Sequence, residues 1–153
     1  MKLKVLLFAS AMAGIALAPM ASAGGAPQGV WLIDGEAAVQ IFDCTGMLCG
    51  RILWLQSPHD PEGKPKRDKK NPDSALRQRE LCGMNVIWNL RPTGANRWDG
   101  GKFYNPDSGR TYDVKLDLTA SDALEARFYE GASFLGETKT LSRVPHGTSK
   151  GWC

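Results

Sequence analysis

Four cysteines carry the clearest chemistry in this chain of 153 residues: Cys44, Cys49, Cys82 and Cys153. In an oxidising compartment an even number of cysteines indicates disulfides, and four cysteines allow three connectivities. Cys44 and Cys49 flank the turn pair Thr45-Gly46, so we expect them to bridge a hairpin and Cys82 to pair with Cys153. A zinc site is the weaker alternative, because the spacing is not C-x-x-C and both histidines lie elsewhere.

The other reactive side chains do not form a recognisable catalytic set. His59 lies in a polar segment and His146 in a glycine-containing tail. The sequence has no G-x-S-x-G, no H-E-x-x-H and no phosphate-binding glycine loop, and disulfides would remove every thiol nucleophile. Asp60, Asp68 and Asp73 are close enough in sequence for a calcium site, but turns and helix caps also use aspartate. We therefore expect a non-catalytic protein without metal or cofactor; an enzyme that uses these carboxylates and His59 is the weaker hypothesis.

A long polar segment, residues 56–73, interrupts the pattern of the chain and carries a basic run from Lys64 to Lys70. It ends in Asn71-Pro72-Asp73, which supplies a helix N-cap, a suitable first helical residue and a favourable negative charge. We therefore expect a helix of about two turns that ends at Gly83. Connections this long are often functional, so the segment is expected to cover one end of the fold, to contact a ligand or to hold an anionic surface.

The first 23 residues have the features of a secretory signal. Lys2 and Lys4 precede an apolar run from Val5 to Leu17, and Ala21-Ser22-Ala23 supplies small residues before the expected cleavage site. The apolar run is shorter than the ~20 residues of a spanning helix, so an uncleaved membrane anchor is the weaker alternative. We therefore expect a mature protein that begins at Gly24 and is periplasmic or secreted.

The expected mature chain is nearly neutral. Loss of Lys2 and Lys4 reduces the 19 Lys and Arg to 17, against 16 Asp and Glu, which leaves a net charge of +1. This balance gives no electrostatic basis for binding nucleic acid. The length fits one domain, for which we expect residues 29–144, preceded by a loose lead at 24–28 and followed by a tail at 145–153.

Short segments with strand character fill most of the mature chain. In Thr111–Leu118, apolar side chains alternate with polar ones, as in a strand with one buried face. Turn signals such as Asp34-Gly35 separate these segments, and we count eight or nine strands. Regular antiparallel hairpins favour a sheet that closes on itself, because closure removes exposed edges. The sequence therefore predicts an all-β, small antiparallel up-and-down barrel with one short helix after the long segment; a β-sandwich is the alternative.

Eight motifs follow one another along the chain: Gly29-Val30-Trp31, Cys44-x4-Cys49-Gly50-Arg51-Ile52, Asp68-x2-Asn71-Pro72-Asp73, Leu76-Arg77-x-Arg79, Cys82-Gly83, Trp98-x-Gly100-Gly101, Tyr104-Asn105-Pro106-x2-Gly109-Arg110-Thr111-Tyr112 and Thr138-x-Thr140-x2-Arg143-Val144. Together they resemble the family of exported bacterial proteins known as domain of unknown function 2147. The resemblance spans Gly29 to Val144 and implies an exported β-rich domain, with no implied activity. The tail with Trp152 and Cys153 departs from the family, which leaves the partner of Cys82 open.

A second resemblance is to lipocalins and related small barrels. Gly29-Val30-Trp31 at the start of the first strand and Arg143 at the end of the last are similar to the residues that close the barrel base in that superfamily. There the tryptophan ring plugs the closed end, the glycine permits a close approach, and the guanidinium stacks on the ring. The resemblance implies that Gly29, Trp31 and Arg143 close one end of the barrel.

These observations favour a barrel that binds a small apolar or amphipathic molecule, with residues 56–73 and the following helix as a lid. A lumen filled by its own side chains is an equal alternative. The second hypothesis is an interaction module that docks on an envelope protein or glycan through Asp68, Asn71, Pro72 and Asp73. For the ligand site we expect four wall residues and two rim charges: Trp54, Trp88, Tyr112, Phe128, Arg77 and Arg79.

Overall fold

The computed structural model of the chain describes residues 25–148 and 152–153. The expected signal sequence therefore lies outside the described residues, as does part of the expected tail. No helix in the described part of the chain is long and apolar enough to cross a membrane.

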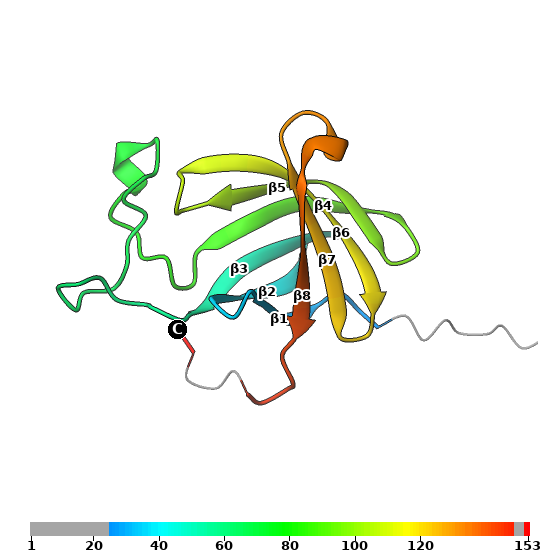
Figure 1. Cartoon of the computed structure of the whole chain (residues 1–153), viewed down its shortest axis with the longest axis horizontal. Coiled ribbons are helices and arrows are strands. Elements are labelled where there is room, and N and C mark those ends of the chain that lie inside the picture. The colour runs from blue at the N-terminus through cyan, green and yellow to red at the C-terminus, as the bar shows by residue number, and fades with distance from the viewer. Residues whose placement is uncertain (1–24, 149–151) are drawn as a thin grey trace, which may run out of the picture.

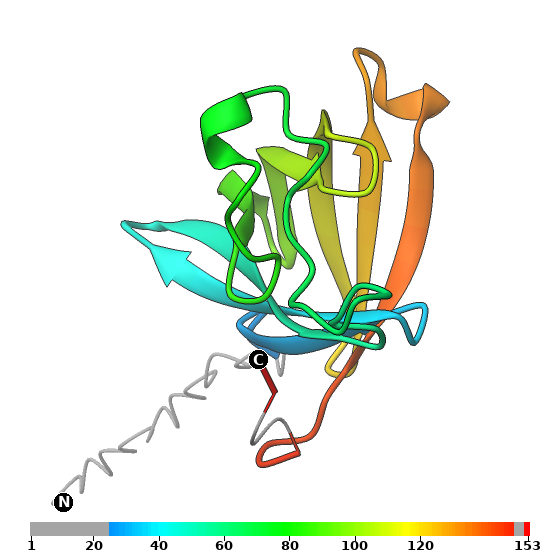
Figure 2. The ribbon, with the colours of Figure 1, turned by 90° about the vertical axis from the view of Figure 1, so that its left-hand side faces the viewer.

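Eight strands form one closed antiparallel barrel in which each strand pairs with its sequence neighbours (Figure 1, Figure 2). The last strand returns to the first, where Trp31 pairs with Arg143 and Leu32 with Ser142. This closure confirms the predicted up-and-down barrel and excludes the β-sandwich. The strands are β1 (Gly29–Ile33), β2 (Ala37–Cys44), β3 (Met47–Leu55), β4 (Asn85–Gly94), β5 (Arg97–Asn105), β6 (Arg110–Ala120), β7 (Ala123–Tyr129) and β8 (Glu137–Arg143).

Alternating side chains give the strands one inner and one outer face. In β6, Val114, Leu116 and Leu118 are buried, whereas the residues between them are partly exposed. Most strands are joined by tight turns. Between β1 and β2 the amide of Glu36 donates to the carbonyl of Ile33, and the two central residues of this turn, Asp34 and Gly35, have positive φ angles of 51° and 73°. Local patterning and turn chemistry therefore agree with the barrel.

Apolar side chains fill the barrel toward the end at which the chain enters and leaves it. Leu90, Leu116, Leu124 and Leu141 are almost completely buried there. Gly101 makes this packing possible, because a Cβ at that position would lie 2.5 Å from Cγ of Leu90. The packed core thus occupies one half of the barrel.

The long connection between β3 and β4 (residues 56–84) contains less helix than predicted. Its helix is the single 3-10 turn η1 (Ser74–Leu76), in which the Asp73 side chain accepts a hydrogen bond from the amide of Ala75, 2.9 Å away. The chain then turns back: the Asp68 amide donates to the carbonyl of Arg79, and that of Leu81 to the carbonyl of Lys66, both at 3.0 Å. Because residues 79–81 are hydrogen-bonded to residues 66–68 in an extended conformation, a second helical turn cannot form there.

Both expected disulfides are present. Cys44 and Cys49 bridge the β2–β3 hairpin with a Cα–Cα distance of 5.9 Å, and Cys82 joins Cys153 at 5.5 Å. The second bridge holds the end of the tail against the barrel, where Trp152 packs on Trp54 with ring centres 5.4 Å apart.

Candidate functional site

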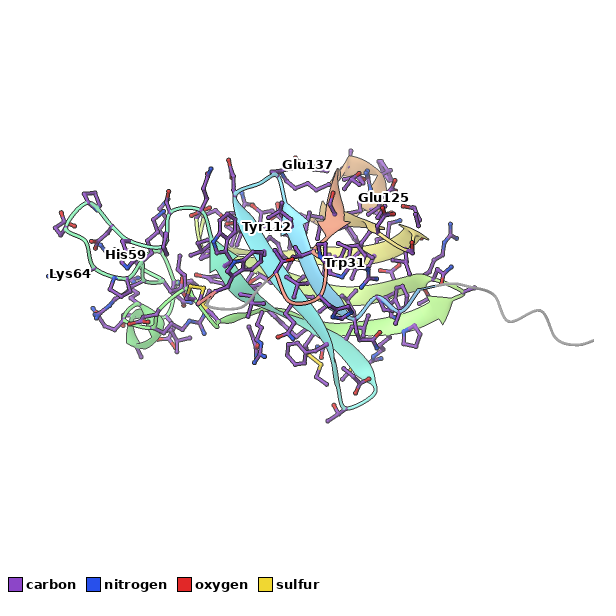
Figure 3. The ribbon with its side chains drawn as sticks, turned by 90° about the horizontal axis from the view of Figure 1, so that it is seen from below. Trp31, His59, Lys64, Tyr112, Glu125 and Glu137 are labelled. Carbon is purple, nitrogen blue, oxygen red and sulfur yellow. A yellow bond between two sulfur atoms is a disulfide. The ribbon has the colours of Figure 1, made fainter. Side chains whose placement is uncertain are left out.

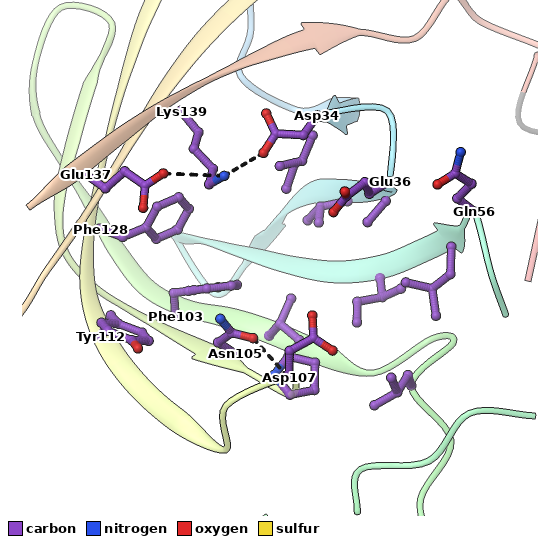
Figure 4. Close-up of a pocket in the computed structure, with 18 of the residues that line it drawn as sticks. Asp34, Glu36, Gln56, Phe103, Asn105, Asp107, Tyr112, Phe128, Glu137 and Lys139 are labelled. Carbon is purple, nitrogen blue, oxygen red and sulfur yellow. Dashed lines mark hydrogen bonds and ion pairs between the residues drawn. The ribbon is translucent and has the colours of Figure 1, made fainter. Parts of the chain in front are cut away.

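A cavity of about 900 Å³ occupies one end of the barrel (Figure 4). All eight strands, β1 to β8, contribute residues to its wall. Two rings dominate one side, where Phe103 and Phe128 lie with centres 4.6 Å apart. The apolar wall residues are Ile33, Val39, Ile52, Val86, Phe103 and Phe128.

The opposite end of the barrel is closed by Trp31 and Arg143. The completely buried Trp31 donates from its indole nitrogen to the carbonyl of Pro27 at 2.8 Å, and the guanidinium carbon of Arg143 lies 4.1 Å from the Trp31 ring centre. Gly29 has a φ of 136°, and a Cβ there would lie 2.6 Å from a guanidinium nitrogen of Arg143. A larger residue at position 29 would displace the arginine, so the three positions depend on one another.

Charged side chains surround the mouth of the cavity. The ammonium of Lys139 lies between two carboxylates, 2.5 Å from Asp34 and 3.5 Å from Glu137 (Figure 4). The hydrogen bond to Asp34 is the main reason why the pKa of Lys139 is raised, so this group stays protonated. Five carboxylates and two lysines line the cavity: Asp34, Glu36, Asp107, Glu130, Glu137, Lys66 and Lys139.

Two of the four predicted wall residues line the cavity and two do not. Tyr112 and Phe128 line the cavity, in phase with the buried residues Val114, Leu116 and Leu118 of β6 and Leu124 and Ala126 of β7. Trp54 and Trp88 do not line it. Trp54 contacts Trp152 of the tail, and the half-buried Trp88 packs against the buried core without reaching the cavity.

The connection is attached to the outside of the barrel through a buried carboxylate, Asp68. This completely buried side chain accepts hydrogen bonds from the Tyr104 hydroxyl at 2.6 Å, the Asn71 amide at 2.7 Å and Nε of Arg79 at 2.9 Å. Burial alone would raise the pKa of Asp68, but these three donors outweigh it and lower the pKa. Burial and the carboxylate together raise the pKa of Tyr104 to about 12.

The arginines that we expected at the rim therefore belong to the connection. Arg79 binds Asp68, and Nε of Arg77 donates to the carbonyl of Asn71 at 2.7 Å. Neither lines the cavity, and the expected lid is mostly a segment packed on the outside of β5, as Figure 2 shows in green. The parts of the connection that reach the mouth are Gln56, Ser57, Lys66 and Leu81.

The other singled-out polar residues lie away from the cavity. His59 is exposed on the outlying part of the connection, where Figure 3 also shows Lys64. Pro72 is exposed beside Asn71, whose side chain accepts a hydrogen bond from the amide of Asp73 at 2.9 Å. Within residues 25–148 and 152–153, no three His, Cys, Asp or Glu side chains are grouped closely enough to hold a metal ion.

Sequence reasoning missed several cavity residues that pattern could have indicated. Phe103 and Asn105 line the cavity two positions apart on β5, in phase with the inward-facing Gly101. The charged residues of the mouth come from turns and from the first residues of β8, and their convergence depends on how the turns meet in space.

An eight-stranded antiparallel barrel with one end closed by a tryptophan–arginine pair and a cavity at the other is a lipocalin-like barrel. The chain belongs to the family described as uncharacterized protein conserved in bacteria (DUF2147), whose model matches residues 29–143. A similar solved structure is protein HP1028 from the human pathogen Helicobacter pylori, described as belonging to the lipocalin family. The likeness has a TM-score of 0.68 and 26% identity, and it covers 80% of this chain and 85% of that one. No curated protein is significantly similar.

Proposed function

We propose that this protein is an exported, non-catalytic carrier that binds a small apolar or amphipathic molecule inside the barrel. The observation that carries the proposal is the cavity of about 900 Å³, which has an apolar wall and a charged mouth. Ligand sites have volumes of ~300–1,000 Å³ and combine apolar walls with a few polar groups. The likeness to a protein described as a lipocalin supports this function.

The distribution of polarity favours one orientation of the ligand. Apolar surface is stabilised by leaving water, so the tail of an amphipathic molecule belongs against Phe103, Phe128 and the aliphatic wall. Its polar head belongs among the charged side chains of the mouth, such as Glu36 and Lys139. This arrangement leaves neither the head nor the mouth charges without a polar partner.

Export is supported by two features. Residues 1–23 have the pattern of a cleaved secretory signal. All four cysteines are disulfide-bonded, as is typical of proteins in oxidising compartments. We therefore propose that the carrier acts in the periplasm or outside the cell.

Docking of an envelope partner through the 56–73 segment receives less support from the contacts of that segment. Asn71 donates to Asp68, which also accepts from Tyr104, so both buried side chains are already bonded inside the protein and are not available to a partner. These contacts indicate that Asp68 and Asn71 serve to attach the connection to the barrel.

The proposal is tested by blocking the cavity. N-phenyl-1-naphthylamine, a neutral apolar probe that fluoresces when it leaves water, should bind the unmodified protein in a one-to-one ratio. Ala37→Trp places an indole in the cavity and should weaken binding by about tenfold or more. Ala75→Trp, an equal change on the exposed η1 turn, should bind like the parent. Native mass spectrometry of protein purified from its own envelope then shows whether a natural ligand is retained; absence of probe binding to the parent would contradict the proposal.

A further inference from the structure

Two large apolar side chains are exposed at one turn beside the mouth of the cavity. Phe134 is 80% exposed and Leu135 75%, both in the 3-10 turn η2 (Ser133–Leu135) between β7 and β8. Among the described residues, the next most exposed large apolar side chain is Leu76, at 39%. Figure 1 and Figure 2 show the η2 turn (orange) projecting beyond the strands. We call Phe134 and Leu135 the apolar tip.

The turn that carries the apolar tip is held firmly. Nε of Arg127 donates to the carbonyl of Ser133 at 2.5 Å, and another nitrogen of the same guanidinium donates to the Thr138 hydroxyl at 2.8 Å. Gly136 packs directly on the backbone, because a Cβ there would lie 2.3 Å from the carbonyl oxygen of Phe128. The two apolar side chains are therefore presented to the outside by a supported turn.

The apolar tip is continuous with the interior of the barrel. Leu135 and the adjoining Gly136 both line the cavity, although the Leu135 side chain is largely exposed. Leu135 therefore offers an apolar molecule a contact along the route between the outside and the cavity wall at Phe128. Such continuity links the exposed tip to the entrance of the site.

We propose that Phe134 and Leu135 insert into the interface of a phospholipid bilayer, so that the apolar ligand passes directly between the membrane and the cavity. The ligand route rests on the proposed carrier function, whereas the bilayer contact itself does not. A bilayer is the medium in which apolar and amphipathic molecules accumulate, and its interface accepts aromatic and aliphatic side chains.

The small size of the apolar tip favours a bilayer over a second protein chain. A stable protein interface buries ~1,200–2,000 Å², whereas an aromatic side chain contributes ~150–250 Å². Two side chains are therefore too few for a lasting dimer. They suit a brief and reversible contact, after which a loaded carrier can leave the membrane again.

Transfer from vesicles tests this inference. Phosphatidylcholine vesicles loaded with N-phenyl-1-naphthylamine are mixed with an excess of the protein, and the first-order rate constant of probe transfer is measured at several protein concentrations. For transfer by contact this rate constant should rise with the protein concentration, whereas for release of the probe through water it should not. The double variant Phe134→Ser/Leu135→Ser should transfer the probe about tenfold more slowly, with its affinity in solution within about twofold of the parent. Leu76→Ser is the matched control, and its transfer rate should equal that of the parent.

The outcomes separate this inference from the carrier proposal. Equal rate constants for parent and double variant, or a parental rate constant that does not depend on protein concentration, would overturn the bilayer contact and leave the carrier function standing. Lack of probe binding in solution would contradict the carrier function. The bilayer contact can then still be tested by co-flotation of the probe-free protein with the vesicles, which the double variant should lose. Concentration-dependent dimerisation that the double variant abolishes would assign the tip to a second copy and overturn the inference.

Discussion

The guanidinium carbon of Arg143 lies 4.1 Å from the centre of the Trp31 ring, at the point where the last strand of the barrel pairs with the first. The nitrogens of Arg143 donate to three backbone carbonyls, those of Ala26, Gln28 and Ser121, at 2.6 to 2.8 Å. One side chain therefore ties the N-terminal lead, β8 and the turn after β6 to the tryptophan that closes the barrel.

Removal of this side chain should destabilise the protein strongly. Arg143→Ala deletes the stacking and all three hydrogen bonds, so we expect the free energy of unfolding to fall by about 3 kcal/mol. Arg51→Ala is the control: its guanidinium carbon also lies over a ring, 5.4 Å from the centre of Phe42, but Arg51 is exposed and bonds to Gln40. There we expect a loss below about 1 kcal/mol, and denaturant unfolding measures both. Equal losses would show that Arg143 does not hold the barrel closed.

The bond between Tyr104 and Asp68 should make stability sensitive to alkaline pH. Folding raises the pKa of Tyr104 from 10.0 to about 12, so the folded protein retains a proton that the unfolded chain loses. The contribution of Tyr104 is therefore fully present below pH 10 and is lost as the pH rises through about 12. Asp68 has the opposite dependence: its contribution is present above its ordinary pKa of 3.8 and is lost as the pH falls through its lower folded value.

Tyr104→Phe tests this assignment. The variant leaves one oxygen of a buried carboxylate without its donor, so we expect a loss of about 1–3 kcal/mol at neutral pH. When the tyrosines are titrated by phenolate absorbance, the variant should also lack the ionisation near pH 12 that Tyr104 contributes in the parent. A parent protein in which every tyrosine ionises near pH 10 would refute the buried bond.

Sequence reasoning succeeded for features of the fold that are determined by residues close together in the sequence. Strand alternation and the Asp34-Gly35 turn are local, and they predicted the barrel correctly. Tyr112 faces the cavity because β6 alternates regularly from Tyr112 to Leu118. Trp88 lies just before Asn89, whose φ of 63° breaks the regular strand, so its face could not be assigned from pattern alone.

The connection illustrates the limit of such reasoning. Arg77 and Arg79 lie in a segment without periodicity, where a polar side chain is placed by whichever partner tertiary structure brings near. For Arg79 that partner is Asp68, whose burial depends in turn on Tyr104 of a distant strand. The two arginines could be recognised in the sequence as part of a motif, but their hydrogen-bond partners could not be predicted.

The two disulfides should contribute unequally to stability. Cys82 and Cys153 are 71 positions apart, and Cys44 and Cys49 five. Because a longer cross-linked loop restricts the unfolded chain more, we expect contributions of about 4 kcal/mol for the long bridge and about 2 kcal/mol for the short one. Denaturant unfolding of two double Cys→Ser variants measures each contribution, and a reductant should remove the difference between parent and variants. A larger loss from the short bridge would contradict this order.

The charges of the mouth should select the head group of an amphipathic ligand. Lys139 is already shared by Asp34 and Glu137, so it is a poor partner for an added anion. Glu36 and Asp107 form no ion pair within the described part of the chain. A cationic head would therefore gain a partner at the mouth, whereas an anionic head would meet like charge.

Ligands with equal tails and different heads make this preference measurable. Decylamine should displace the fluorescent probe at a concentration about tenfold lower than decanoate, with decanol between them, and added salt should narrow the difference. Glu36→Gln should weaken decylamine binding by about twofold to fivefold and leave decanol unchanged, because it removes charge without changing the apolar wall. Glu62→Gln makes the same chemical change on the exposed connection, away from the cavity, and should alter neither. If decanoate binds as tightly as decylamine, Lys66 or Lys139 serves the head group and the carboxylates of the mouth do not direct selection.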